Sequence, residues 1–348
     1  MRRRGPFLTV CLGLMASVAG CGSTTDAALP DPIVVPLLVE TYTDGATRLF
    51  IQVQLGGAPP FTALLDTGSS GLRVIDTAVP RTAFTTVTDT PVSYAYGNYD
   101  SSISINGVVA YAPLTLGALT TERPIAIMYV ETGGCSGTGT NCRTLQDQFS
   151  EAPAILGVGM RTASNAQGIG NPIAQMPGRP PFVIHIPTGF SSMDGTLRIG
   201  RATTDALAFQ TLKLPSLGQG VPLPNGAPSW NDAAIPCCVD NDLTGESFCY
   251  PSLWDTGAPV STITTAGQPL ALTTELAVGS PIRVTIGPES APVGAYEFVV
   301  GAMPQPGIDE VLIEPAAGSP GINLGVALFN QFDVLFDQAR GVVGLAAR

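Results

Sequence analysis

Two short segments in opposite halves of the chain each carry an aspartate that could act as an acid or a base. The first reads LLDTGSS from Leu64 to Ser70, and the second reads LWDTGA from Leu253 to Ala258. Each is an apolar run typical of a strand, followed by an Asp-Thr-Gly turn whose glycine lets the backbone pack closely. Two carboxyl groups about 3 Å apart cannot both ionise, so they share one proton. Asp66 and Asp255 would then act as base and acid on one water molecule, which is chemistry for adding water to a carbonyl.

The order and content of the motifs resemble the pepsin-like aspartic proteases. Further segments between about Pro36 and Ala347 are similar to that family in residue type and in order: Ser69–Leu72, Tyr94–Gly97, Ile155–Gly157, Leu324–Gly325, Phe332–Asp337 and Val343–Ala346. The resemblance implies an all-β fold, a bilobal pepsin-like double β-barrel with a central cleft and a few short helices. It also implies that Asp66 and Asp255 face each other on the floor of that cleft.

The same resemblance implies roles for the neighbouring residues. Small and hydroxyl residues are implied to support the two catalytic loops, namely Thr67, Gly68, Ser69, Thr256 and Gly257. Tyr96 and Gly97 are implied to belong to a flap that closes over the substrate. The implied activity is that of an aspartic endopeptidase, which hydrolyses polypeptide substrates at acidic to mildly acidic pH without a metal or another cofactor. Because one chain supplies both aspartates, we expect a monomer.

Two positions depart from the family pattern and keep other functions open. The residue after the second Asp-Thr-Gly is usually a hydroxyl residue that hydrogen-bonds the aspartate, but here it is Ala258. Loss of that bond is expected to raise the pKa of Asp255. Arg73 stands where a large aromatic is common, which is expected to alter the substrate pockets. One alternative is therefore a non-catalytic pepsin-fold binding protein at the cell surface, and another is a structural envelope lipoprotein.

The N-terminus predicts export. A basic start at Met1–Arg4 is followed by an apolar stretch from Phe7 to Ala19, which is shorter than the roughly 20 residues that span a bilayer. The string Val-Ala-Gly-Cys ending at Cys21 resembles the bacterial lipobox, in which the cysteine is lipidated. We expect residues 1–20 to be a signal peptide and residues 21–32 a lipid-anchored tether, with an ordinary signal peptide as the alternative. The expected location is the bacterial outer membrane, the cell surface or the periplasm, with the lipid as the sole membrane contact.

The remaining cysteines predict disulfides, as expected in an oxidising compartment. Cys135 and Cys142 flank a loop rich in Gly, Thr and Ser and are expected to pair. Cys249 is expected to pair with either Cys237 or Cys238, which leaves one cysteine over.

Charge and histidine content exclude several classes of function. The formal net charge is −11 with a single lysine, so the chain lacks the basic surface that a nucleic-acid partner needs. The one histidine, His185, lies in an apolar run and is expected to be a strand residue, which argues against a Ser-His-Asp hydrolase. The cysteines and this histidine supply no tetrahedral set at short spacing, so no metal site is predicted.

Strand signals dominate the rest of the chain, and 40 Gly and 31 Pro interrupt it with turns. The length suits two lobes, predicted to span residues 33–188 and 189–348. Short helices are expected near Arg143–Phe149 and Val326–Gln331. The predicted strands are Ile33–Glu40, Arg48–Leu55, Phe61–Leu65, Ile103–Ala110, Ile125–Val130, Pro181–Ile186, Thr196–Ile199, Pro281–Ile286 and Glu297–Val300.

Overall fold

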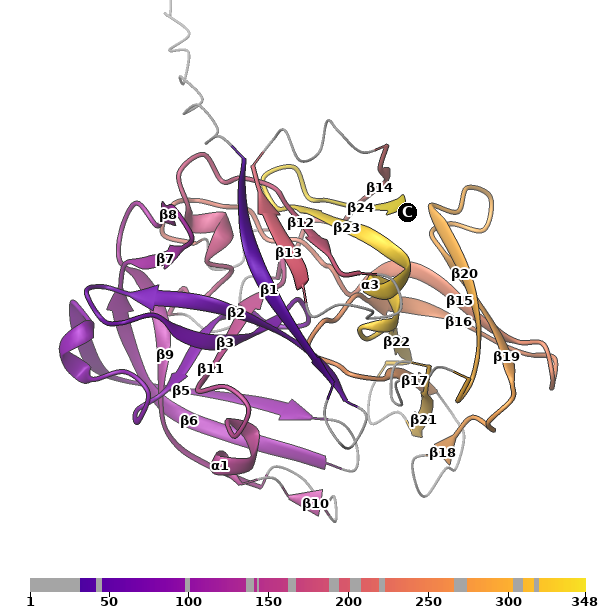
Figure 1. The fold of residues 1–348 in the computed structure, drawn as a ribbon, viewed down its shortest axis with the longest axis horizontal. Coiled ribbons are helices and arrows are strands. Elements are labelled where there is room, and N and C mark those ends of the chain that lie inside the picture. Colours follow the sequence, from indigo (N-terminus) through magenta and orange to yellow (C-terminus); the bar gives the residue numbers. More distant parts are fainter. Residues whose placement is uncertain are drawn as a thin grey trace, which may run out of the picture.

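The computed structural model describes most of the chain beyond the N-terminal segment. The described residues are 32–41, 46–97, 101–135, 141–142, 144–161, 167–187, 194–200, 208–218, 223–265, 274–302, 309–315 and 319–348. Within them the fold is mostly β, and the strands form two sheets (Figure 1). The all-β class predicted from the sequence is therefore confirmed.

The larger sheet has 16 strands and contains residues from both halves of the chain. Its main path runs β10 (Asn141–Cys142), β6 (Ser101–Ala112), β9 (Ile125–Cys135), β4 (Ser70–Ile75), β11 (Ala154–Val158), β3 (Phe61–Asp66), β2 (Thr47–Leu55), β1 (Ile33–Thr41), β13 (Asp194–Ile199), β12 (Phe182–His185), β23 (Phe332–Asp337), β24 (Val342–Ala347) and β14 (Gln210–Lys213). Off this path, β5 (Thr86–Gly97) pairs with β6, while β7 (Leu114–Leu116) pairs with β2 and with β8 (Leu119–Thr120).

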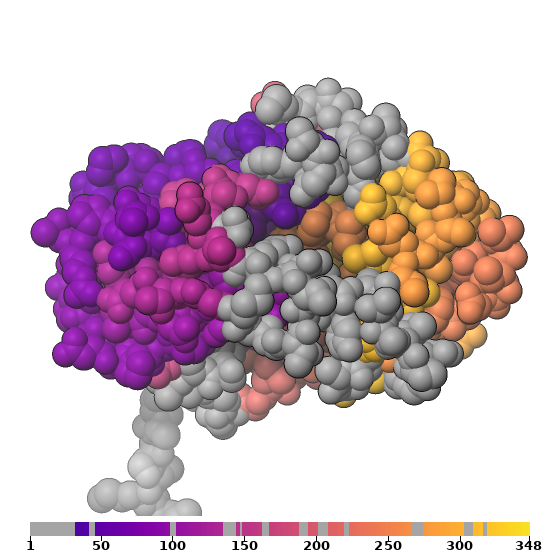
Figure 2. Space-filling model, turned by 90° about the horizontal axis from the view of Figure 1, so that it is seen from below, coloured from indigo at the N-terminus to yellow at the C-terminus, as the bar shows by residue number. Residues whose placement is uncertain are grey.

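The smaller sheet has eight strands, all from the C-terminal half. Its order is β18 (Thr274–Glu275), β21 (Val311–Pro315), β17 (Ser261–Thr265), β22 (Gly321–Asn323), β16 (Glu246–Leu253), β15 (Ile235–Asn241), β19 (Pro281–Ile286) and β20 (Gly294–Val299). In the space-filling view, the N-terminal strands and the C-terminal strands gather at opposite ends of the molecule (Figure 2).

Helical structure in the described residues is short. It consists of the α-helices α1 (Leu145–Gln148) and α3 (Ala327–Gln331) and the 3₁₀ turns η1 (Arg81–Ala83) and η2 (Ile173–Gln175). The two α-helices lie where the sequence predicts them. The nine predicted strands are also present, as β1, β2, β3, β6, β9, β12, β13, β19 and β20.

The same four-strand arrangement occurs in each half of the chain. In the first half, β11 lies parallel to β3 and antiparallel to β4, and β4 is parallel to β9. In the second half, β22 lies parallel to β16 and antiparallel to β17, and β17 is parallel to β21. Asp66 is the last residue of β3, and Asp255 lies two residues after the end of β16, the corresponding strand of the second set. Equivalent strand sets therefore present Asp66 and Asp255.

Aromatic side chains fill the core where the two sheets meet. Phe182 on β12 stacks on Phe336 of β23, with ring centroids 5.1 Å apart. Trp254, which directly precedes Asp255, is 1% exposed and meets Phe336 edge to face. Full burial of one large apolar side chain is worth about 1.5–3 kcal/mol. The residue before the second aspartate is thus anchored by the packing between the sheets.

A disulfide joins Cys238 on β15 to Cys249 on β16, which face each other across the antiparallel pair. Successive side chains of a strand point to opposite faces. Cys237 therefore lies on the buried face and is a free thiol, while Cys238 lies on the other face with its partner. This register resolves the pairing of Cys249 that the sequence left open.

We expect the double variant Cys238→Ser with Cys249→Ser to lose about 2–3 kcal/mol of unfolding free energy, because the bond closes a loop of sequence separation 11. Urea denaturation measures this loss. The double variant should show a lower midpoint than the oxidised wild type, and equal midpoints for the two would contradict the prediction.

Several sequence predictions fall outside the described residues. They are the signal peptide, Cys21 with most of the tether, and the boundary between residues 188 and 189. The side chains of Cys135 and Cys142 are also not described, so their pairing stays a prediction. In the described part of the chain, no helix is long and apolar enough for a membrane crossing.

Candidate active site

Each aspartate lies at the exit of a buried strand. Asp66 is the last residue of β3 and is 5% exposed, and the preceding Leu65 is fully buried. Asp255 lies two residues after the end of β16, next to the buried Trp254, and keeps partial exposure to solvent. The apolar neighbours fix the backbone, so both carboxyl groups have a defined direction.

Thr67 and Thr256 tie the two aspartate loops together through four hydrogen bonds. The hydroxyl of Thr67 donates to the carbonyl of Trp254 (2.7 Å) and accepts from the Thr256 backbone N–H (2.9 Å). The hydroxyl of Thr256 donates to the carbonyl of Leu65 (2.7 Å) and accepts from the Thr67 backbone N–H (3.0 Å). Both threonines are almost fully buried. Because each hydroxyl satisfies one donor and one acceptor of the other loop, the loops are held in register.

The glycines of the two motifs bring the carboxyl groups together. A Cβ placed on Gly68 would overlap the carboxyl group of Asp255. A Cβ on Gly257 would lie 2.7 Å from Asp66 Oδ1 and 3.1 Å from Asp255 Oδ1. One point is therefore in contact with both oxygens, so the two carboxyl groups must lie near each other. Side chains larger than hydrogen would thus separate the loops. The structure thus brings the carboxyl groups of Asp66 and Asp255 close to each other.

Asp66 accepts hydrogen bonds from its own loop. The backbone N–H groups of Gly68 (2.8 Å) and Ser69 (3.1 Å) donate to Oδ1, and the Ser69 hydroxyl donates to Oδ2. Donors aimed at a carboxylate stabilise its charge. Both carboxyl oxygens of Asp66 are therefore held by donors from its own loop.

Asp255 has fewer donors and a different environment. The Gly257 N–H donates to its Oδ1 (2.8 Å), and the Asn323 side-chain amide donates to its Oδ2 (2.8 Å). Burial, and then the nearby charge of Asp66, raise the pKa of Asp255 to about 7, while the two donors act in the opposite direction. A carboxyl group that keeps its proton near neutral pH beside another carboxyl group is a suitable acid.

The β5–β6 hairpin places two tyrosines beside the first aspartate loop. The Tyr96 hydroxyl lies 3.5 Å from Ser69 Oγ, and burial raises the pKa of Tyr96 well above its ordinary value, so the hydroxyl stays protonated. Tyr94 packs on Tyr96, with ring centroids 4.8 Å apart. Tyr96 therefore lies beside the first aspartate loop, and Gly97 is the last residue of β5. The residues that follow, 98–100, lie outside the described part of the chain.

Arg73 lies beneath these tyrosines and is 1% exposed. Its guanidinium donates to the carbonyls of Gly71 (2.9 Å) and Ser70 (3.1 Å), and its carbon Cζ lies 3.8 Å from the Tyr94 ring centroid. Burying a cation is costly unless dipoles or ring faces compensate for lost water. Arg73 therefore supports the hairpin from below.

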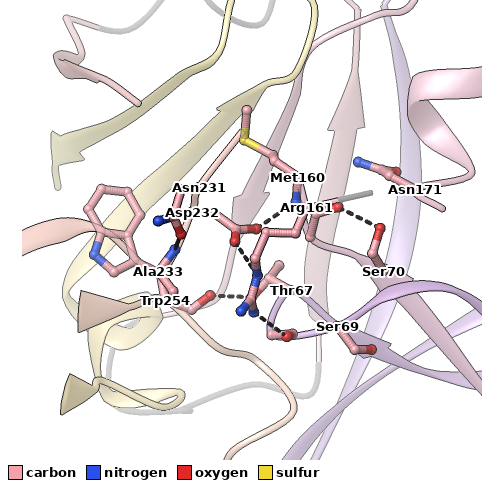
Figure 3. A network of polar contacts seen from close by, with 12 residues as sticks. Thr67, Ser69, Ser70, Met160, Arg161, Asn171, Asn231, Asp232, Ala233 and Trp254 are labelled. Atoms are coloured by element: carbon pink, nitrogen blue, oxygen red, sulfur yellow. Dashed lines mark hydrogen bonds and ion pairs between the residues drawn. The ribbon is translucent and has the colours of Figure 1, made fainter. Parts of the chain in front are cut away.

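Arg161 connects the first aspartate loop to the second half of the chain. Its Nη2 donates to the Gly68 carbonyl (3.0 Å), and its Nε lies 2.7 Å from Asp232 Oδ1. Asp232 also accepts from the Met160 N–H (2.6 Å). Figure 3 shows Arg161 lying between Asp232 and the loop that carries Thr67 and Ser69. This ion pair braces the turn that contacts Asp255.

The structure gathers most of the predicted site residues and adds three that the sequence interpretation missed. Asp66, Thr67, Gly68, Ser69, Asp255, Thr256, Gly257 and Tyr96 lie together around the carboxyl pair. The additions are Asn323, Arg161 and Asp232. Asn323 directly precedes the Leu-Gly pair that the resemblance singled out, which is the one signal that could have drawn attention to it.

His185 lies elsewhere, at the end of β12 as predicted, with its Nδ1 2.7 Å from Asp333 Oδ1. Among the residues that the structure describes, no group of three or more His, Cys, Asp or Glu side chains could hold a metal ion. The absence of a cofactor stays a prediction.

Comparison of the sequence with protein-family models found no matching family, and comparison with curated proteins found no significant relative. The geometry of the carboxyl pair is therefore the basis for assigning a function to this chain.

Proposed function

We propose that this protein is an aspartic endopeptidase with a pepsin-like bilobal fold, in which Asp66 and Asp255 hydrolyse peptide bonds. The observation that supports this proposal most directly is the close approach of two carboxyl groups on equivalent loops that Thr67 and Thr256 lock together. A substrate strand would lie between the carboxyl pair and the β5–β6 hairpin, with Tyr96 excluding water from above.

The proposed reaction needs one proton on the pair. Asp66, with its three donors, takes a proton from a water molecule as that water attacks the peptide carbonyl carbon. Asp255 gives its proton to the carbonyl oxygen, which yields a tetrahedral diol. The proton on Asp66 then passes to the amide nitrogen, the C–N bond breaks, and Asp255 recovers a proton from one hydroxyl. No covalent intermediate with the enzyme forms.

The raised pKa of Asp255 sets the upper limit of the active pH range. The pair keeps its single proton only below the pKa of this acid, which is about 7. Hydrolysis is therefore expected at acidic to mildly acidic pH, with loss of rate as the pH rises through neutrality.

The test is cleavage of an unfolded protein and of internally quenched peptides by the purified chain between pH 3 and pH 8. We expect cleavage that is fastest below pH 7 and blocked by a statine-type inhibitor. Binding of peptides without cleavage at every pH would instead favour the alternative of a surface binding protein. If the chain neither binds nor cleaves peptides, a structural lipoprotein is the better interpretation.

We also propose that the protein is exported and held at the bacterial envelope through lipidated Cys21. The Cys238–Cys249 disulfide supports export, because such bonds persist in oxidising compartments. Metabolic labelling with a radioactive fatty acid, compared between the wild type and Cys21→Ser, tests the anchor. Equal labelling of both chains would contradict it.

A further inference from the structure

The two aspartate loops receive their side-chain donors from different places. On the first loop, the donor to the Oδ2 atom is Ser69, which directly follows Asp-Thr-Gly. On the second loop the same position is Ala258, which has no hydroxyl, and the donor to Oδ2 is Asn323 on β22. The chain thus supplies a comparable contact from a strand rather than from the turn.

Strand register shows that Asn323 replaces an apolar residue of the other half. In the first set of strands, Ile155 pairs with Leu64 on one side and with Arg73 on the other. In the second set, Asn323 pairs with Leu253 and with Thr262. Leu64 and Leu253 each lie two residues before an aspartate, so Asn323 and Ile155 occupy equivalent positions. A backbone that holds isoleucine in one half holds a polar amide in the other.

Two contacts fix the direction of the Asn323 amide. Its Oδ1 accepts a hydrogen bond from the Gly325 backbone N–H (3.0 Å), and its Nδ2 lies 2.8 Å from Asp255 Oδ2. A backbone N–H can only donate, so the amide oxygen must face Gly325 and the NH₂ group must face Asp255. The side chain is therefore held as a donor to the carboxyl group.

We propose that Asn323 is a positioning residue of the hydrolytic site, which orients Asp255 and favours its ionised form in place of the hydroxyl missing at Ala258. The kinetic consequences of this proposal rest on the proposed function, but the effect of Asn323 on Asp255 does not require catalytic turnover. The titratable groups that interact with Asp255 are Asp66 and Tyr94, and neither of them is changed in the variants below.

The main variant is Asn323→Ile, which installs the residue found at the equivalent position of the first half. We expect kcat to fall about 10-fold with KM little changed, since the acid loses its orientation but the substrate contacts remain. We also expect the alkaline limb of the pH–rate profile to move upward by about one pH unit, because a donor to the carboxylate is lost.

Rescue separates positioning from a merely structural role. Adding Ala258→Ser to Asn323→Ile places a hydroxyl after the second Asp-Thr-Gly, as Ser69 is placed after the first. We expect this double variant to regain most of kcat and the original alkaline limb. A fall in kcat with an unmoved pH profile and no rescue would overturn the proposal, as would an unchanged Asn323→Ile variant.

A second measurement keeps this inference separate from the proposed function. The ¹³C chemical shift of the Asp255 carboxyl, followed by NMR against pH, reports its titration in wild type and in Asn323→Ile without substrate. A higher midpoint in the variant supports the role of Asn323 even if the wild type hydrolyses nothing. Equal midpoints overturn that role even if the wild type is an active peptidase.

Discussion

We expect Asp66→Asn and Asp255→Asn each to lower kcat for peptide cleavage by about 10³-fold or more, because each removes one of the two groups that move protons. Asparagine keeps the size of the side chain and the contacts of Oδ1, so the loops should stay in place. Cleavage of a quenched peptide at pH 5 measures the loss. Unchanged activity in either variant would refute the mechanism.

A stability measurement on the same variants distinguishes lost chemistry from lost folding. The pKa of Asp255 is raised to about 7 in the folded protein, from an ordinary value near 4. The folded state therefore binds more protons than the unfolded state between these values, and stability falls as the pH rises through that window. Asp255→Asn removes this titration, so we expect its unfolding free energy to fall less than that of the wild type between pH 4 and pH 7, even though its NH₂ group replaces an acceptor of the Asn323 amide.

A surface carboxylate provides the matched control for both measurements. Asp242 is exposed and pairs with Arg283 at 3.4 Å, far from the proposed chemistry. Asp242→Asn is expected to leave kcat within a factor of two and the unfolding free energy within about 0.5 kcal/mol. Loss of activity in this variant would show that the assay responds to something other than the carboxyl pair.

The second large effect is expected from Thr256→Val, which keeps the shape of the side chain but removes its hydroxyl. The Leu65 carbonyl and the Thr67 N–H, both at buried positions, would lose their partner. Each buried polar group without a partner costs about 1–3 kcal/mol, so we expect a loss of about 3 kcal/mol in unfolding free energy. Peptide cleavage should fall as well, because the two aspartate loops lose half of their connection.

Thr256→Ser is the control for this prediction, since it keeps the hydroxyl and removes only a methyl group. It should retain most activity and lose no more than about 1.5 kcal/mol. Thermal and urea unfolding followed by circular dichroism measure both variants. Equal destabilisation by valine and serine would mean that packing of the methyl group, rather than the hydrogen bonds, holds the loops.

The sequence by itself determined the β class, the position of many strands and the two aspartate motifs, because these depend on local patterns. Alternation of apolar and polar residues marks strands such as β1 and β19, whose buried faces follow the period of two. An aspartate directly after a buried apolar residue is equally local. Even the alternation that buries Cys237 and turns Cys238 outward is a property of β15 alone.

The tertiary structure decided which distant residues complete the site. Asn323 reaches Asp255 across a separation of 68 residues because β22 is inserted between β16 and β17, and no local pattern in the sequence specifies that register. The ion pair of Arg161 with Asp232 and the burial of Arg73 beneath Tyr94 arise in the same way. Hydrogen bonds and ion pairs depend on fractions of an ångström between elements, whereas strand patterns depend only on which face of one element is buried.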